Sequence, residues 1–292
     1  MELVLGGVPL HVTCGGAPLS QRIASRYARF RGGASGRPLR IRLRVDPEAR
    51  PPRYHPSWVD NPPLEASGDL ERARCRAPGY RAAFRFRAGK AAAVIPDSLA
   101  HADLTIRVAL GGCLLARGEG TLLHAAAAVR DGFGLLFAGP SGAGKSTLAR
   151  LCREAGLEVL ADEMVIVRRS GAGLRVHGTP FWHGSARSAP AGGLFLLQKA
   201  ERPEVERIPP SRALAGLLGA GGAPLDLPDL QRAFFEAAAA LLRRVPAYRL
   251  GFRRDTDFLD CLDALPEFAF WRPRRRRERL LPQAPQPVER TP

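Results

Sequence analysis

The stretch Gly139-Pro140-Ser141-Gly142-Ala143-Gly144-Lys145-Ser146-Thr147 has the composition and spacing of a complete phosphate-binding loop. It follows the apolar residues 134–138 and precedes a helical pattern over 148–154, which is the strand–loop–helix order that such a loop needs. Glycines let backbone N–H groups turn inward around phosphate oxygens, and the following helix points its positive end at the same anion. The sequence therefore predicts a nucleoside triphosphate site formed by residue 139 and residues 141–147.

Two side chains of the loop have specific expected roles. Lys145 should reach the outer phosphates, and the Ser146 hydroxyl is suited to bind Mg²⁺. Lys145 is one of only three lysines in a chain with 44 Lys and Arg residues. A Lys among so many arginines indicates that this position requires a compact ammonium group.

Composition limits the class of protein. A chain of 292 residues with 45% hydrophobic residues can form one large or two modest folded domains. No apolar run approaches the roughly 18–20 residues of a membrane-spanning helix, and residues 1–5 lack the basic start of a secretory signal. The five cysteines show no CxxC spacing, so neither a metal site nor a disulfide framework is indicated. We expect a cytoplasmic protein without a transmembrane segment.

The formal net charge of +16 would ordinarily suggest a nucleic-acid partner. The excess is almost entirely Arg, spread along a chain rich in Ala, Gly and Pro, which is typical of a GC-rich coding sequence. Much of it lies in residues 272–279, inside a Pro-rich tail. We therefore predict no specific nucleic-acid partner.

The chain divides into three parts by pattern. Residues 1–118 read as a smaller α+β region of unknown role, with a helix over 20–30, strands over 39–45 and 82–87, a Pro-rich loop over 50–63 and a buried helix over 104–116. Residues 119–265 contain the phosphate loop and form the main α/β domain. Residues 266–292 form a basic, Pro-rich tail that we expect to be disordered.

Within 119–265, Asp131-Gly132 separates the apolar runs 122–129 and 133–138 and predicts a hairpin. A second hairpin is expected over 164–177. The remaining predicted elements are strands over 157–161, 194–197 and 245–252 and helices over 211–218, 229–244 and 255–265.

An acidic pair, Asp162-Glu163, ends the strand expected over 157–161. Carboxylates at a strand end beside a phosphate loop are suited to binding a metal ion and orienting an acceptor. Only one short helix separates Lys145 from this pair, whereas transporter-type ATPases place the acid much farther along. A GTPase is a weaker alternative, because Gln198-Lys199-Ala200-Glu201 is only a distant match to the guanine-binding motif.

Taken together, residues 123–126, the loop 139–147, residues 160–163 and residues 178–180 resemble the catalytic domain of HPr kinase/phosphorylase. They are more similar still to the HPr kinase-related proteins found beside bacterial peptide-modification gene clusters. The resemblance covers residues 119–265. It implies an α/β fold with a P-loop mixed sheet, shared with ATP-dependent phosphoenolpyruvate carboxykinase.

The resemblance also implies residue roles. Asp162 would accept the proton of an acceptor serine, Glu163 would lie near the metal ion, and His124 would lie close to Asp162 at the transfer site. Catalytic roles thus fall on Asp162, Lys145 and His124, and metal binding falls on Ser146, Glu163 and Asp162. An isolated His in a Leu- and Ala-rich strand can also be a purely structural residue.

The sequence therefore predicts an ATP- and Mg²⁺-dependent serine kinase acting on a small protein or peptide. Two alternatives stay open: an ATP-binding switch or scaffold with little turnover, and a kinase of a small molecule such as serine. Assembly into a homo-oligomer is also left open.

Overall fold

The computed structural model describes residues 1–50, 64–171 and 173–266. The expected loop over 50–63 and the basic tail over 266–292 lie almost wholly outside this range. The first half of the described chain contains these elements: β1 (Glu2–Leu5), β2 (Val8–Gly15), α1 (Ala17–Arg26), the 3₁₀ turn Ala28–Phe30, β3 (Leu39–Val45), β4 (Glu65–Gly68), β5 (Ala73–Ala77), β6 (Tyr80–Arg85), β7 (Lys90–Ile95) and α2 (Leu99–Ala116).

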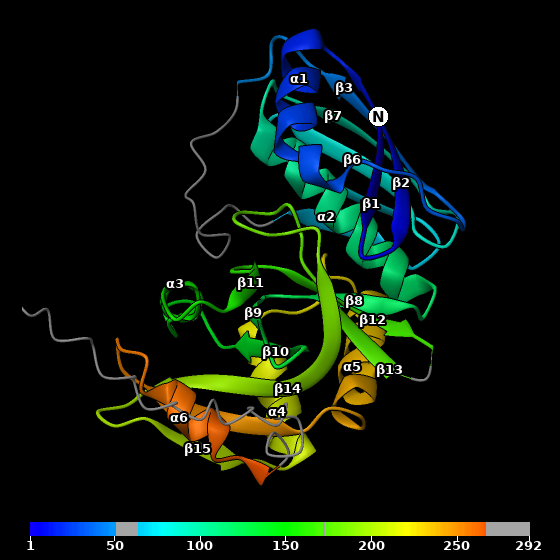
Figure 1. Cartoon of the computed structure of the whole chain (residues 1–292). Helices are drawn as coiled ribbons and strands as arrows, with labels where there is room; N and C mark the ends of the chain where they lie inside the picture. Colours follow the sequence, from blue (N-terminus) through cyan, green and yellow to red (C-terminus); the bar gives the residue numbers. More distant parts are fainter. Residues whose placement is uncertain (51–63, 172, 267–292) are drawn as a thin grey trace, which may run out of the picture.

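Seven strands in the described first half form one sheet in the order β1-β2-β3-β7-β6-β5-β4. Its strands alternate between buried and exposed residues, as in β3, where Leu39, Ile41 and Leu43 are buried and the arginines between them are exposed. Such alternation means that only one face of the sheet is covered. Helices α1 and α2 cover that face (Figure 1).

The second half contains the following elements: β8 (Gly120–Leu123), β9 (Ala125–Arg130), β10 (Phe133–Ala138), α3 (Lys145–Glu154), β11 (Glu158–Ala161), β12 (Val165–Ser170), β13 (Gly173–His177), β14 (Ser188–Lys199), β15 (Glu204–Arg207), α4 (Pro210–Ala220), α5 (Pro228–Leu242), β16 (Ala247–Phe252) and α6 (Phe258–Asp263).

The nine strands of this part form a mixed sheet, so the predicted α/β class with a mixed sheet around the phosphate loop is confirmed for the described residues. Strand β10, which leads into the loop, pairs in parallel with β14, and β14 pairs in parallel with β16. On its other side β10 pairs antiparallel with β9. The predicted hairpin is present, with positive φ angles of 49° at Asp131 and 85° at Gly132.

Both faces of this second sheet are covered. One core joins β9, β10, β14 and β16 to α3 and α6. The other core continues through α2, α4 and α5 into the N-terminal sheet. The two sheets, which fall on either side of residues 117–119, are thus held together by one continuous apolar core.

Helix α2 connects the two sheets. It contacts β3, β6 and β7 on one side and β8 and α5 on the other. Within the described residues it is the single helix whose length and hydropathy would allow it to cross a membrane, and 83% of that span is buried inside the fold. From the sequence we expected no apolar run of membrane-spanning length. Helix α2 has that length and hydropathy, but most of it is buried inside the fold.

Several elements differ from the sequence prediction. The apolar run 122–129 is two strands, because the chain bends at His124: β8 pairs with β12, whereas β9 pairs with β10 and β11. The strand expected over 194–197 lies in the C-terminal half of β14, which spans Ser188–Lys199. Strands β1, β2, β4, β5, β7 and β15 were not predicted.

Candidate phosphate-transfer site

The phosphate loop connects the buried strand β10 to helix α3. Gly142 and Gly144 have φ angles of 76° and 104°, which side-chain-bearing residues rarely adopt. A Cβ atom on Gly144 would also lie 2.7 Å from Cζ of Phe252. The loop therefore needs glycine for backbone conformation and for space. Ser146 is exposed in the first turn of α3, where a hydroxyl can reach a ligand at the positive helix end.

The Lys145 side chain is folded back over the loop. Its Nζ donates hydrogen bonds to the carbonyl oxygens of Gly139, at 2.8 Å, and of Pro140, at 3.2 Å. The residue is 7% exposed, and this burial lowers the pKa of the ammonium group, against the opposing effect of Glu163. A buried ammonium bonded only to neutral carbonyls is suited to exchange them for phosphate oxygens.

The carboxylates of Asp162 and Glu163 have different neighbours. Asp162 is 5% exposed, accepts a hydrogen bond from the His183 N–H at 3.3 Å and lies 3.6 Å from the Arg153 guanidinium. Glu163 instead interacts with Arg107 and Lys145, while burial raises its pKa above the usual range. Glu163 is thus the acid coupled to the lysine of the phosphate loop.

The loop over 178–184 packs closely against the acidic pair. The Thr179 hydroxyl donates to the Met164 carbonyl at 2.7 Å, and the Ser185 N–H donates to the Leu160 carbonyl at 2.8 Å. A Cβ atom on Gly184 would lie 1.8 Å from the Thr179 carbonyl oxygen. A Cβ atom on Gly178 would lie 2.4 Å from the Leu160 carbonyl oxygen, so glycine there permits close contact between the loop and the end of β11.

A cavity of about 220 Å³ opens beside Glu163, between α2 and the second sheet. Leucine, valine, alanine, methionine and proline side chains form most of its wall, and its ionisable lining groups are His124, Glu163 and Arg107. His124 Nδ1 lies 3.1 Å from the Ala220 carbonyl oxygen, which fixes Nδ1 as the donor and leaves Nε2 as the acceptor. Burial and the nearby Lys145 lower the pKa of His124 to about 4, so the ring is neutral at pH 7.

The structure therefore brings Lys145, Glu163 and His124 together. Asp162 does not line the cavity that His124 lines; its carboxylate faces the loop over 178–184. His124 was expected to lie close to Asp162, whereas in the described residues the acid that shares its cavity is Glu163.

Arg107 was missed by the sequence interpretation. It extends from α2, its guanidinium carbon lies 5.8 Å from the ring centroid of Phe181, and burial lowers its pKa to about 10. Asp103, one turn earlier on α2, accepts a hydrogen bond from the Tyr27 hydroxyl at 2.8 Å. The sequence pattern could have pointed to Arg107, because it is an isolated cation in the apolar helix predicted over 104–116, and a cation at such a position usually has a specific partner.

The donor set fits Mg²⁺ together with a triphosphate. Among the described residues no group of three or more His, Cys, Asp and Glu side chains could hold a metal ion. Mg²⁺ is commonly bound by only one or two protein groups with phosphate oxygens and water as its other ligands. Ser146 and the acidic pair are able to supply such ligands.

Fold and site together define an α/β protein in which a glycine-rich loop with a buried lysine joins the strand β10 to the helix α3. A family model described as SynChlorMet cassette protein ScmC matches residues 113–265, which is more than half of the 292 residues. The chain belongs to this family. None of the curated proteins matches it.

Among solved structures, the chain is similar to the Hpr(Ser) kinase/phosphatase from Coxiella burnetii. The identity is 14%, the match covers 46% of this chain and 80% of that one, and the TM-score is 0.28. At this TM-score the likeness says nothing further about the chain.

Proposed function

We propose that the protein is an ATP- and Mg²⁺-dependent phosphotransferase that moves the γ-phosphoryl group to a hydroxyl, which is a serine hydroxyl of a small protein or peptide. The observation that carries the proposal is the geometry of the site: Lys145 is buried in a glycine-rich loop, and Glu163 and His124 line one cavity. Phosphoryl transfer needs a phosphate-binding cation and an acid beside an acceptor pocket. Lys145 and Glu163 would fill these two roles.

We assign the following roles to the residues of the site. The loop N–H groups and Lys145 bind the outer phosphates, and Lys145 leaves the carbonyls of Gly139 and Pro140 to do so. Ser146 and Asp162 would hold Mg²⁺, which would neutralise charge on the phosphates. The acceptor hydroxyl enters the cavity beside Glu163 and His124.

We assign the base role to Glu163 in place of Asp162. Burial raises the pKa of Glu163, which makes its carboxylate a stronger base, and the residue lines the cavity that would hold the acceptor. As the acceptor oxygen bonds to the γ-phosphorus, the bond to the ADP oxygen breaks and the hydroxyl proton passes to Glu163. His124, neutral and with Nε2 free to accept, can orient the acceptor hydroxyl.

Arg107 is a positioning residue in this scheme. As a cation beside Glu163 it keeps the carboxylate ionised, and it opposes the effect of burial on the pKa of that group. It also lies over Phe181 in the loop that packs against the acidic pair. The N-terminal half thus contributes to the site through α2.

Incubation of the purified chain with γ-labelled ATP, Mg²⁺ and an extract of the source cells tests the proposal. Label in a small protein or peptide, lost in the Lys145→Ala variant, is the expected result. Label in the low-mass fraction would identify a small-molecule kinase instead. Tight ATP binding without any labelled product would identify a nucleotide-dependent switch.

A further inference from the structure

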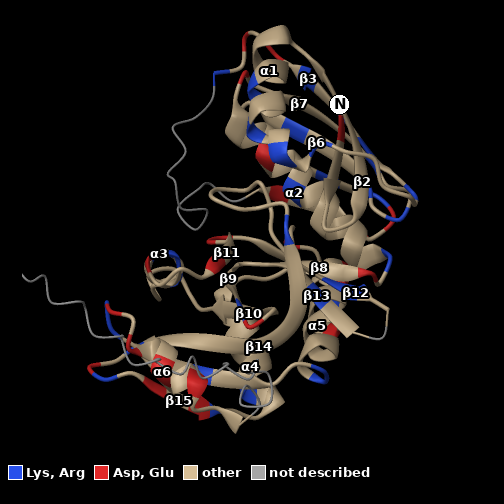
Figure 2. Cartoon of the chain, viewed as in Figure 1, with Lys and Arg blue, Asp and Glu red and all other residues tan. Residues whose placement is uncertain are grey.

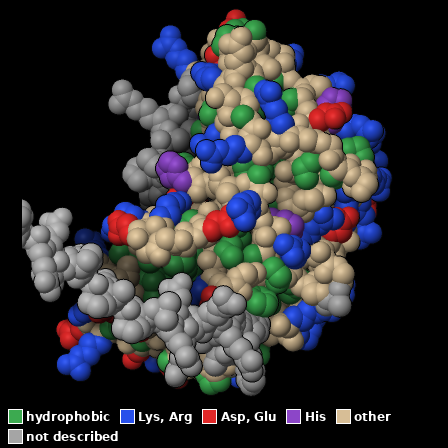
Figure 3. Space-filling model, viewed as in Figure 1, with side chains coloured by type: hydrophobic (Ala, Val, Ile, Leu, Met, Phe, Trp, Pro, Cys, Tyr) green, Lys and Arg blue, Asp and Glu red, His purple; other side chains and the backbone are tan. Residues whose placement is uncertain are grey.

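The uncovered face of the N-terminal sheet carries charge of a single sign over its central strands. At the outward positions of β3, β5, β6 and β7, every charged residue is Lys or Arg. In Figure 2 blue positions interrupt the tan ribbon near β3 and β6, whereas red and blue are mixed around α6 and β15. Blue side chains also gather along the margin of this half of the molecule in Figure 3.

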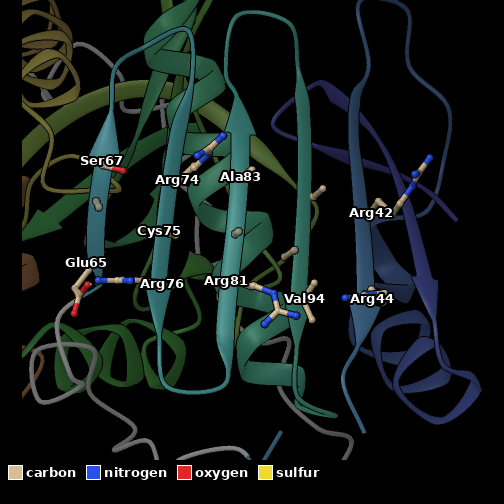
Figure 4. A pocket seen from close by; sticks show the side chains of 14 residues that line it. Arg42, Arg44, Glu65, Ser67, Arg74, Cys75, Arg76, Arg81, Ala83 and Val94 are labelled. Carbon is tan, nitrogen blue, oxygen red and sulfur yellow. Dashed lines mark hydrogen bonds and ion pairs between the residues drawn. The ribbon is translucent and has the colours of Figure 1, made fainter. Parts of the chain in front are cut away.

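The strand register arranges the cations around a shallow centre. Arg74 of β5 pairs with Ala83 of β6, Ala83 pairs with Ala92 of β7, and Ala92 pairs with Arg42 of β3. Two small side chains therefore lie between two arginines in one row across the sheet. In the next row Val94 lies between Arg81 and Arg44 (Figure 4).

This arrangement forms a hollow of about 760 Å³. Its floor is made of alanines and Val94, and its rim carries Arg42, Arg44, Arg74 and Arg81. Within the described residues no acidic side chain forms an ion pair with any of these four arginines. Glu65 and Arg76 also line the hollow and pair with each other at 2.5 Å, and outside it Arg87 pairs with Glu71 at 2.8 Å.

The spacing of the cations suits an extended acidic chain. Arg40, Arg42 and Arg44 project from the same face of β3, so they recur at about 7 Å, the repeat of every second residue in an extended chain. Guanidinium groups bind carboxylates with two parallel hydrogen bonds. In an extended polypeptide with an acidic residue at every second position, each carboxylate could thus face one arginine of this row.

The same face lacks the features of a surface that binds single-stranded nucleic acid. Such sheets carry exposed aromatic rings on their central strands for base stacking. The outward positions of β6 and β7 instead hold Ala83, Ala92 and Val94. The Arg-rich segment over 272–279 of this chain cannot be the ligand either, because it has the same charge as the face.

We propose that the open face of the N-terminal sheet is a docking surface for an extended acidic segment of a partner polypeptide. Helix α2 and the covered face of the sheet lie between this surface and the phosphate loop, so docking is separate from the chemical site. The inference goes beyond the proposed phosphotransferase activity and predicts binding whether or not the chain transfers phosphate.

Fluorescence anisotropy with three labelled probes tests the proposal: a twelve-residue peptide alternating Glu and Ser, the matching peptide with Gln for Glu, and a twelve-nucleotide oligo(U). The surface variant is R42E/R74E/R81E. The matched control is R202E/R212E/R254E, which makes the same charge change at exposed positions of the second half. Thermal unfolding and ATP binding verify that both variants are folded.

The expected result is that the Glu peptide binds the wild type and the control with similar affinity, within about twofold. The surface variant should bind it at least about tenfold more weakly, because each reversal replaces an attraction by a repulsion. The Gln peptide should not bind. Equal binding of the Glu peptide by surface variant and control would overturn the proposal.

Two other outcomes would also overturn it. If oligo(U) bound far more tightly than the Glu peptide at the same salt concentration, and lost binding in the surface variant, the face would be a nucleic-acid surface. If the wild type were a dimer in sedimentation and the surface variant a monomer, the face would be an interface between copies of this chain.

Discussion

The two sheets of this protein differ in how they are covered. The N-terminal sheet has one face packed against helices and one face open, and its strands alternate aliphatic residues with arginines. The second sheet is packed on both faces, and its central strand β10 is apolar throughout. Along β10 polar chemistry is therefore confined to the strand end and the loop that follows it, whereas in the first sheet it covers a whole face.

The sharpest test of this difference compares neighbouring residues on one strand. Leu135 and Leu136 of β10 belong to separate cores, so Leu135→Ala and Leu136→Ala should each lower the free energy of unfolding by about 2–5 kcal/mol. On β3, Ile41→Ala should cost a similar amount, while Arg42→Ala should cost less than about 0.5 kcal/mol. Urea unfolding measures all four, and a small effect at either leucine would contradict the two-core description.

The next comparison is between the two residues of the acidic pair, Asp162 and Glu163. Glu163→Gln should lower phosphoryl transfer by about 100-fold or more while ATP still binds, because the proton acceptor is lost. Asp162→Asn, which removes an acid directed at Arg153 and the loop over 178–184, should have a smaller effect. Single-turnover transfer measures both. The reverse order of effects would return the base role to Asp162.

A third test uses His101, which is 1% exposed at the start of α2. Burial lowers its pKa to about 4. Between pH 6.5 and pH 4 the unfolded chain therefore binds a proton that the folded chain does not, so this residue's contribution to stability falls as the pH falls. From pH 7 to pH 4.5 the contribution should drop by about 2 kcal/mol.

The measurement is the free energy of unfolding at pH 7 and pH 4.5 for wild type and His101→Gln. The variant should lose less stability on acidification than the wild type, and the comparison cancels the opposite contributions of Asp103 and Glu163, whose pKa values are raised. Identical losses would show that His101 is already accessible to protons in the folded state.

The smallest expected effect concerns the open face. Glu65 forms an exposed ion pair with Arg76 at the edge of the hollow. Glu65→Gln should leave stability unchanged within about 0.5 kcal/mol and tighten binding of the Glu peptide about twofold, because it releases a guanidinium group. Anisotropy titration measures this. Weaker binding by the variant would mean that Glu65 contacts the peptide directly.

Local chemistry explains what the sequence could predict. The phosphate loop, the Asp131-Gly132 hairpin, strand β3 and helix α2 each follow from residues that determine their own conformation or from a clear periodicity. The acidic pair was found by its position after a short strand. These features depend on neighbours in the chain, and so they can be read from it.

Long-range packing explains what the sequence could not predict. Residues 188–193 contain Pro190 and two glycines and have little strand preference, yet they extend β14 because Arg175, Val176 and His177 of β13 pair with them. The closeness of Arg107 to Glu163 joins residues on opposite sides of the phosphate loop in sequence. Alternation along an extended strand by itself sends Asp162 and Glu163 in different directions. Which of the two meets the loop over 178–184 depends on how that loop packs, and in the structure it is Asp162.

Equilibrium binding of MgATP to the wild type, Lys145→Ala and the matched control Lys199→Ala tests the central claim most directly. If a triphosphate is held between the phosphate loop and Glu163, Lys145→Ala should weaken binding by about 100-fold, because a buried charged hydrogen-bond donor is lost, and Lys199→Ala should change it less than about twofold. Equal affinity of all three proteins for MgATP would contradict the assignment of this loop as the nucleotide site.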